Sequence, residues 1–90
     1  MLYMVIENFR HGDAVPVYRR FRDQGRLAPD VLRYVSSWVD TTFHRCSQVT
    51  ECDNRALLDQ WMRRWNDLID VEVVTVISSA EPAAAIAPRL

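Results

Sequence analysis

Residues 31–52, VLRYVSSWVDTTFHRCSQVTEC, decide the fold that this sequence predicts. Two extended runs, VLRYVSSWVD (31–40) and HRCSQVTEC (44–52), are separated only by the turn-like TTF, and this pattern is typical of a β-hairpin. The hairpin lies in the middle of a chain of 90 residues, with room for one strand and one helix on either side. A single small α+β domain is therefore indicated.

The segments that flank the hairpin supply these elements. LYMVIENF (2–9) is a short apolar run that suits a central strand, and a helix is expected from Val15, with Pro16 near its first position. Asp53 is expected to cap a second helix, and VEVVTVIS (71–78) is a β-branched last strand. The apolar stripe of the second helix consists of Leu57, Leu58, Trp61, Met62, Trp65 and Leu68.

The predicted order is βαββαβ, the ferredoxin-like arrangement. It gives a four-stranded antiparallel sheet in the order 4-1-3-2, with both helices on one face. Residues 1–79 form this domain, and the Ala/Pro-rich residues 80–90 are expected to be a flexible C-terminal tail. The uncovered sheet face still carries apolar residues, so we expect it to pair with a second copy of the chain as a homodimer.

Five segments carry a resemblance to known proteins: MLYMVIENFR, VYRRFRDQGR, LRYVSSWVD, LLDQWMRRWNDL and VEVVTVISSAE. They are similar to a family of small bacterial proteins of unknown function that is assigned to the dimeric α+β barrel superfamily. The similarity covers residues 1–81 and implies a dimeric barrel without a known activity. Other members of the superfamily include monooxygenases, isomerases and haem-modifying enzymes, which is an analogy of fold alone.

Composition excludes several classes of function. The net charge is -1, with eleven basic residues scattered among twelve acidic ones, so no positive field would gather nucleic acid or an anionic membrane. Residues 44–52 also lack an aromatic on which bases would stack. The first residues, MLYMVIENFR, form neither a signal peptide nor a membrane span, and a cytoplasmic protein is predicted. No phosphate-binding or dinucleotide-binding motif occurs, and no cofactor is predicted.

The two cysteines are expected to be free, inert thiols. Cys46 and Cys52 are six residues apart in one predicted strand, which separates them by about 20 Å. They are too far apart for a disulfide or a shared metal ion. His11 and His44 are expected at opposite ends of the sheet, so no metal site is predicted from them.

Acidic residues supply the candidates for catalysis. Glu7, Glu51 and Glu72 are expected to meet at one edge of the sheet, close to His11. A carboxyl in such a cluster acquires a raised pKa that suits general acid-base chemistry, so Glu7, Glu51 and His11 are the catalytic candidates. The alternative is that these carboxylates pair with arginines and have a structural role. Whether the protein is an enzyme stays open.

A second set of residues predicts a ligand site. Tyr34, Ser36 and Trp38 are expected to share the helix-facing side of one strand, and Gln48 to occupy the next. A cleft between sheet and helices would then suit a small apolar or aromatic ligand. The alternative is an ordinary core in a structural or regulatory dimer without catalytic activity. The predicted ligand-binding residues are Tyr34, Trp38, Gln48, Trp61 and Trp65.

Overall fold

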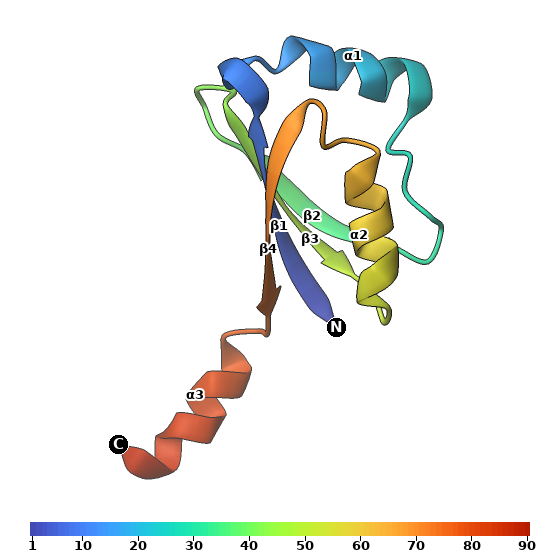
Figure 1. The fold of residues 1–90 in the computed structure, drawn as a ribbon. Coiled ribbons are helices and arrows are strands. Elements are labelled where there is room, and N and C mark those ends of the chain that lie inside the picture. Colours follow the sequence, from blue (N-terminus) through green and yellow to red (C-terminus); the bar gives the residue numbers. More distant parts are fainter.

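The computed structural model describes residues 1–90 and is an α+β domain with one sheet and three helices (Figure 1). Short 3-10 turns follow the first strand and the last helix. The main elements are β1 (Leu2–Phe9), α1 (Val15–Gln24), β2 (Arg33–Val39), β3 (Arg45–Glu51), α2 (Arg55–Arg63), β4 (Ile69–Val76) and α3 (Ala80–Ile86).

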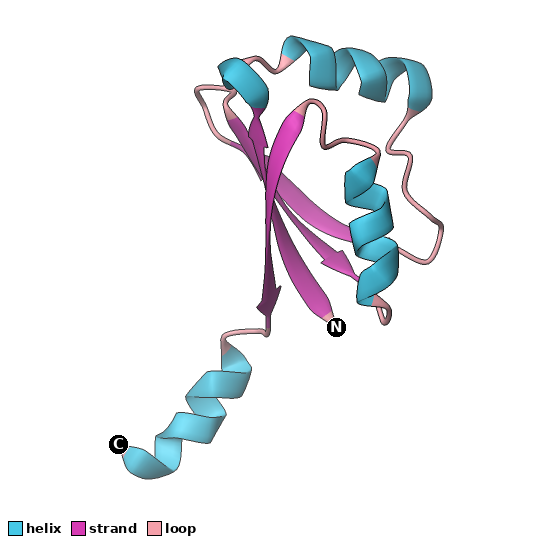
Figure 2. Ribbon diagram, in the orientation of Figure 1, coloured by secondary structure: helices cyan, strands magenta, loops and turns pink.

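The four strands form one antiparallel sheet in the order β2-β3-β1-β4 (Figure 2). The predicted strand order is thereby confirmed. The first strand, β1, lies inside the sheet and pairs with β3 on one side and β4 on the other. Its apolar residues of the two parities lie on the two faces of the sheet, with Tyr3 and Val5 on the buried side and Met4 and Ile6 on the other.

The sheet has two faces of different character. Tyr3, Val5 and Phe9 point toward α1 and α2 and are buried. On the other side, called the open face below, no helix covers the sheet (Figure 1). The apolar residues of the open face are Leu2, Met4, Ile6, Trp38, Val49, Val74 and Val76.

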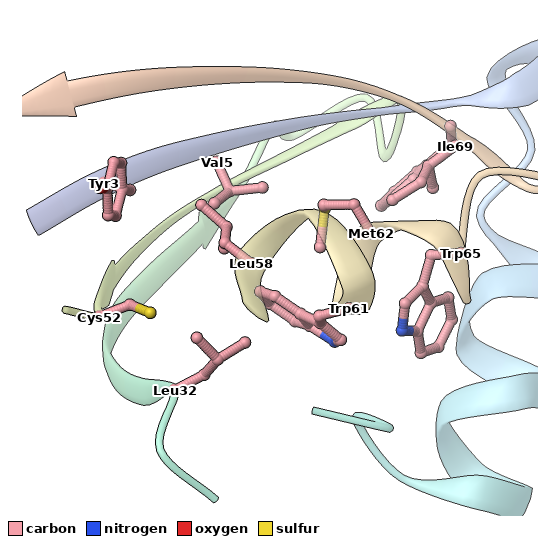
Figure 3. Close-up of a cluster of buried hydrophobic side chains, with 10 residues drawn as sticks. Tyr3, Val5, Leu32, Cys52, Leu58, Trp61, Met62, Trp65 and Ile69 are labelled. Carbon is pink, nitrogen blue, oxygen red and sulfur yellow. The ribbon is translucent and has the colours of Figure 1, made fainter. Parts of the chain in front are cut away.

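The core lies between the sheet and α2 (Figure 3). Its centre is Leu58, which is 0 % exposed and faces the equally buried Val5 of β1. Burial of apolar side chains at about 25 cal/mol per Å² is the main source of stability in a domain of this size. The core consists of Tyr3, Val5, Phe9, Leu32, Cys52, Leu58, Trp61, Met62, Trp65 and Ile69.

The second helix begins one residue later than predicted. Asn54, not Asp53, is the cap, and its side-chain oxygen accepts a hydrogen bond from the backbone N–H of Ala56 at 3.0 Å. Leu58, Trp61 and Met62 then fall on the buried side, as the periodicity of the stripe predicts.

The first helix does not pack into the core as α2 does, because none of its residues is buried. It lies across the end of the sheet at which β1 ends (Figure 1). The Arg20 guanidinium donates hydrogen bonds to both carboxylate oxygens of Asp67, at 2.8 and 2.6 Å. The Tyr18 ring meets the Phe9 ring edge-on, with centroids 6.4 Å apart. A space therefore remains between α1 and the sheet.

A β-bulge in β2 overturns one prediction. Tyr34 pairs with Thr50 and Ser36 pairs with Val49, so Val35 is an extra residue in the strand. An extra residue reverses the alternation of side chains beyond it. Trp38 therefore lies on the open face, where the residue is 60 % exposed, instead of facing the helices beside Tyr34.

The antiparallel register overturns two further predictions, the cluster of carboxylates and the separation of the two histidines. Glu51 pairs with Leu2 at the beginning of β1, whereas Glu7 lies near its end, so the predicted cluster of carboxylates does not form. The prediction assumed that the ends of β1 and β3 meet, but antiparallel neighbours bring the end of one strand to the start of the other. For the same reason the two histidines share one end of the sheet, where the His44 ring lies against Gly12.

Residues 80–90 are the segment expected to be a flexible tail, and residues 80–86 of it form α3. This helix has no buried residue and projects away from the sheet (Figure 2). Flexibility of this segment stays a prediction. None of the helices combines the length and the apolar character needed to cross a lipid bilayer.

The packing of α2 predicts the stability of core variants. Replacement of Leu58 by Ala should lower the free energy of unfolding by about 2–5 kcal/mol, because it leaves a cavity in a fully buried site. Leu57 is only partly buried, so Leu57→Ala is the matched control and should cost markedly less. Urea unfolding followed by circular dichroism measures both values, and equal losses would contradict the packing of α2.

Candidate functional site

A cavity of about 390 Å³ lies beneath α1, between the sheet and α2. It is open to solvent on one side, because Tyr18 and Phe21 on α1 are 50 % and 52 % exposed while still lining it. The cavity exists because α1 meets the sheet only at its end and buries none of its own residues. Its lining consists of Glu7, Phe9, Val17, Tyr18, Phe21, Arg26, Tyr34, Ser37, Val39, Cys46, Gln48, Trp61 and Trp65.

The polar lining residues form a connected chain on the sheet side of the cavity. The Gln48 side-chain amide donates to a Glu7 carboxylate oxygen at 3.1 Å, and its oxygen accepts from the Arg26 guanidinium at 3.2 Å. Thr50 is a more distant donor to the same oxygen, at 3.5 Å. The Gln48 amide thus links the buried carboxylate to the cation, which fixes the orientation of all three groups.

Arg26 is held in place by the core. The indole N–H groups of Trp61 and Trp65 both donate to the Arg26 carbonyl oxygen, each at 2.9 Å. The two indole nitrogens accordingly turn toward each other (Figure 3). The Arg26 guanidinium carbon lies 5.1 Å from the centre of the Tyr34 ring and 5.0 Å from that of the Trp61 ring, within the range of cation–π attraction.

Glu7 is a carboxyl that lines the cavity and is largely removed from water. Burial raises the pKa of its carboxyl, because the charged form loses its water. Hydrogen bonds from Gln48 and Cys46 and the positive charge of Arg26 act in the opposite direction without cancelling this effect. No ion pair of the structure includes Glu7. A carboxyl whose pKa is raised by burial is a candidate for proton exchange with a ligand.

Both cysteines are free, as predicted. Burial, together with the nearby Glu7 carboxylate, raises the pKa of the Cys46 thiol to about 12. The thiol is therefore protonated at neutral pH and is a poor nucleophile, although it lines the cavity. Cys52 is buried in the core, where its sulfur contacts the backbone of Asn54.

The structure brings together most of the predicted ligand-site residues: Tyr34, Gln48, Trp61 and Trp65 line the cavity. The bulge moves Trp38 to the other face. Of the three catalytic candidates, Glu7 alone lines the cavity, while Glu51 lies near an exposed arginine, Arg33, at 3.7 Å, and His11 is in an exposed turn.

Arg26 was missed by sequence reasoning. It follows Gly25, whose φ of 73° ends α1, and precedes Leu27, whose φ of 59° turns the chain toward α2. Both are left-handed conformations, which non-glycine residues seldom adopt. The sequence offers no signal for the left-handed conformation at Leu27. The position of the Arg26 side chain in the cavity was therefore not foreseeable.

The site lacks the ligands for a metal ion, because no group of three or more His, Cys, Asp or Glu side chains converges anywhere in the structure. Its chemistry is that of a largely apolar cavity whose charged groups are one partly buried carboxyl and one guanidinium, with the Gln48 amide between them. Such a site can orient a small molecule through few polar contacts, and its carboxyl can accept or return a proton.

The fold and the cavity thus define a small α+β domain with an aromatic, solvent-accessible cavity. The chain belongs to the DUF3303 family, a domain of unknown function, whose model matches residues 1–90. No curated protein and no solved structure shows a significant match to the chain.

The raised pKa of Glu7 predicts how stability responds to pH. The folded protein binds this proton more tightly than the unfolded chain does, so the contribution is fully present below the ordinary value of 4.5 and is lost as pH rises through the raised pKa. Glu7→Gln removes this loss. The variant should therefore gain stability relative to the parent protein between pH 4 and pH 7.

Thermal unfolding of both proteins across this pH range measures the difference. Glu81→Gln, an exposed change on α3, is the control and should track the parent protein. A difference between Glu7→Gln and parent that stays constant with pH would show that the carboxyl is not destabilised by burial.

Proposed function

We propose that this protein is a cytoplasmic homodimer that binds a small, planar, largely apolar ligand in the cavity beneath α1. The observation that carries the proposal is the cavity itself, whose volume of about 390 Å³ lies within the range of small-molecule sites, about 300–1,000 Å³. Two free thiols are in keeping with a reducing compartment.

The walls of the cavity favour a planar ligand. Aromatic rings line it from four elements and from the turn after α2, namely Phe9, Tyr18, Phe21, Tyr34, Trp61 and Trp65. Rings prefer offset-stacked or edge-on contacts, which a flat ligand can make with several of them at once. A flexible aliphatic ligand would gain less from these walls and would lose more conformational entropy on binding.

The open face supports the dimer. It carries apolar side chains on all four strands, including Trp38 and Val74, which are 60 % and 41 % exposed, and the register places charged residues such as Glu51 and Glu72 on the same face. A large exposed apolar patch on a small domain favours an interface, and two copies of one face form a closed pair about a twofold axis. The pairing is that of a dimeric α+β barrel, with the two cavities on its outer sides.

One observation favours a second candidate function, a structural or regulatory dimer without a ligand. Every buried side-chain N or O atom already has a hydrogen-bond partner within the chain, so the cavity needs no ligand to satisfy its polar groups. The two functions differ in whether the cavity is occupied in the cell.

The dimer predicts the effect of a charge on the open face. Trp38→Asp should weaken self-association about 100-fold or more, because it would bury an unpaired carboxylate in an apolar interface. Val15→Asp is the matched control, since Val15 is also exposed but lies on α1, on the other side of the sheet. Sedimentation equilibrium measures both constants, and a parent protein that is monomeric at micromolar concentration would overturn the dimer.

Ligand binding predicts a retained mass. Native mass spectrometry of freshly purified protein should show a dimer that carries additional small-molecule mass, and Val17→Trp should remove this mass by filling the cavity. Val31→Trp is the control, because Val31 is exposed and lies outside the cavity lining. A dimer without additional mass would favour the structural function instead.

A further inference from the structure

The Glu7 carboxylate lines the cavity and has spare hydrogen-bonding capacity. Its hydrogen-bond donor within the chain is the Gln48 amide at 3.1 Å, and the Cys46 thiol lies nearby. An ionised carboxylate offers about four acceptor sites, so these neutral groups leave at least half of them free. A buried carboxylate without an ion pair is costly, and a further donor would stabilise it. The cavity therefore favours a ligand that donates a hydrogen bond.

A cationic ligand would meet competition from the protein's own arginines. The Arg26 guanidinium already lies over the Tyr34 and Trp61 rings, and the Arg20 guanidinium lies 5.5 Å from the centre of the Trp65 ring. These are the rings to which a cation would be attracted most strongly. Arg26 is also separated from Glu7 by only the Gln48 amide, so the negative charge of Glu7 is already partly offset.

An anionic ligand is disfavoured by Glu7. A second carboxylate in the same apolar space would be repelled by the first, and Arg26 is the only basic residue that lines the cavity. The arrangement of one partly buried anion and one partly buried cation is balanced, so it selects an uncharged ligand. Specificity then depends on the hydrogen bond to Glu7.

We propose, on the basis of the ligand-binding function above, that the cavity takes an uncharged planar ligand with a phenol-type or enol-type hydroxyl, and that this hydroxyl donates its hydrogen bond to the Glu7 carboxylate. The aromatic walls contact the ring system of the ligand. The Gln48 amide, held by Arg26, keeps the carboxylate pointed toward the hydroxyl. Glu7 is the binding residue, and Gln48 is a positioning residue.

Four probes with one ring system test this assignment: 2-naphthol, naphthalene, 2-naphthoate and 2-naphthylmethylammonium. Isothermal titration calorimetry at pH 7.5 should give binding of 2-naphthol about tenfold tighter than that of naphthalene, as expected for a hydrogen bond to a charged group. Both charged probes should bind more weakly than 2-naphthol. In Glu7→Gln the preference for 2-naphthol over naphthalene should fall to about twofold or less, whereas Glu51→Gln, which lies outside the cavity, should retain it.

The pH dependence of the unmodified protein gives an independent readout if Glu7→Gln folds poorly. The charged and titratable groups that face Glu7 are Cys46 on β3, Tyr18 on α1 and Arg26 in the loop after α1. The pKa of Cys46 is about 12 and that of Tyr18 is raised by burial, so Glu7 is the first acid of this group to lose its proton as pH rises. The preference for 2-naphthol should therefore decline as pH falls through the raised pKa of Glu7, because the carboxylate becomes protonated.

The outcomes separate the two proposals. Equal binding of naphthalene and 2-naphthol would leave the cavity as a ligand site but overturn the role of Glu7. Tightest binding of either charged probe would overturn the selection of uncharged ligands. Absence of binding by all four probes would overturn both the ligand class and the ligand-binding function on which it rests.

Discussion

The Arg26 carbonyl oxygen, which accepts hydrogen bonds from two tryptophan indoles, connects the core of this protein to its cavity. A carbonyl oxygen has two lone pairs, and Trp61 and Trp65 together use both. The positions of these indoles follow from the packing of α2 against the sheet. The core thereby fixes the loop after α1, the loop fixes the Arg26 guanidinium, and the guanidinium orients Gln48 toward Glu7. The polar part of the site is thus a consequence of apolar packing.

The cost of burying Glu7 is distributed over several weak contacts. A direct ion pair with Arg26 would have lowered the pKa of the carboxyl, whereas the intervening Gln48 amide keeps the two charges apart. The carboxyl consequently keeps a raised pKa and open acceptor sites at the wall of the cavity.

The sequence was sufficient for the strand order, for α2 and for four of the cavity residues, because hydrophobic periodicity and hairpin spacing are local signals. Trp38 was misplaced because a single bulged residue reverses the direction of every later side chain in β2, and alternation alone does not reveal the insertion. Glu51 was misplaced because the prediction brought the ends of β1 and β3 together, whereas the end of β3 lies beside the start of β1. Arg26 reaches the site through two left-handed backbone conformations, and the one at Leu27 is set by tertiary structure.

The helices α1 and α2 have different structural roles in this small domain. The second helix supplies the core, so its inner residues are constrained by packing. The first helix contributes no buried residue, and the principal polar bond that anchors it is between Arg20 and Asp67. Exposed positions of this kind usually tolerate substitution at a cost below about 0.5 kcal/mol. Substitutions at positions 18 and 21, which are exposed and line the cavity, would therefore change the shape of the cavity while the core and Glu7 stay in place.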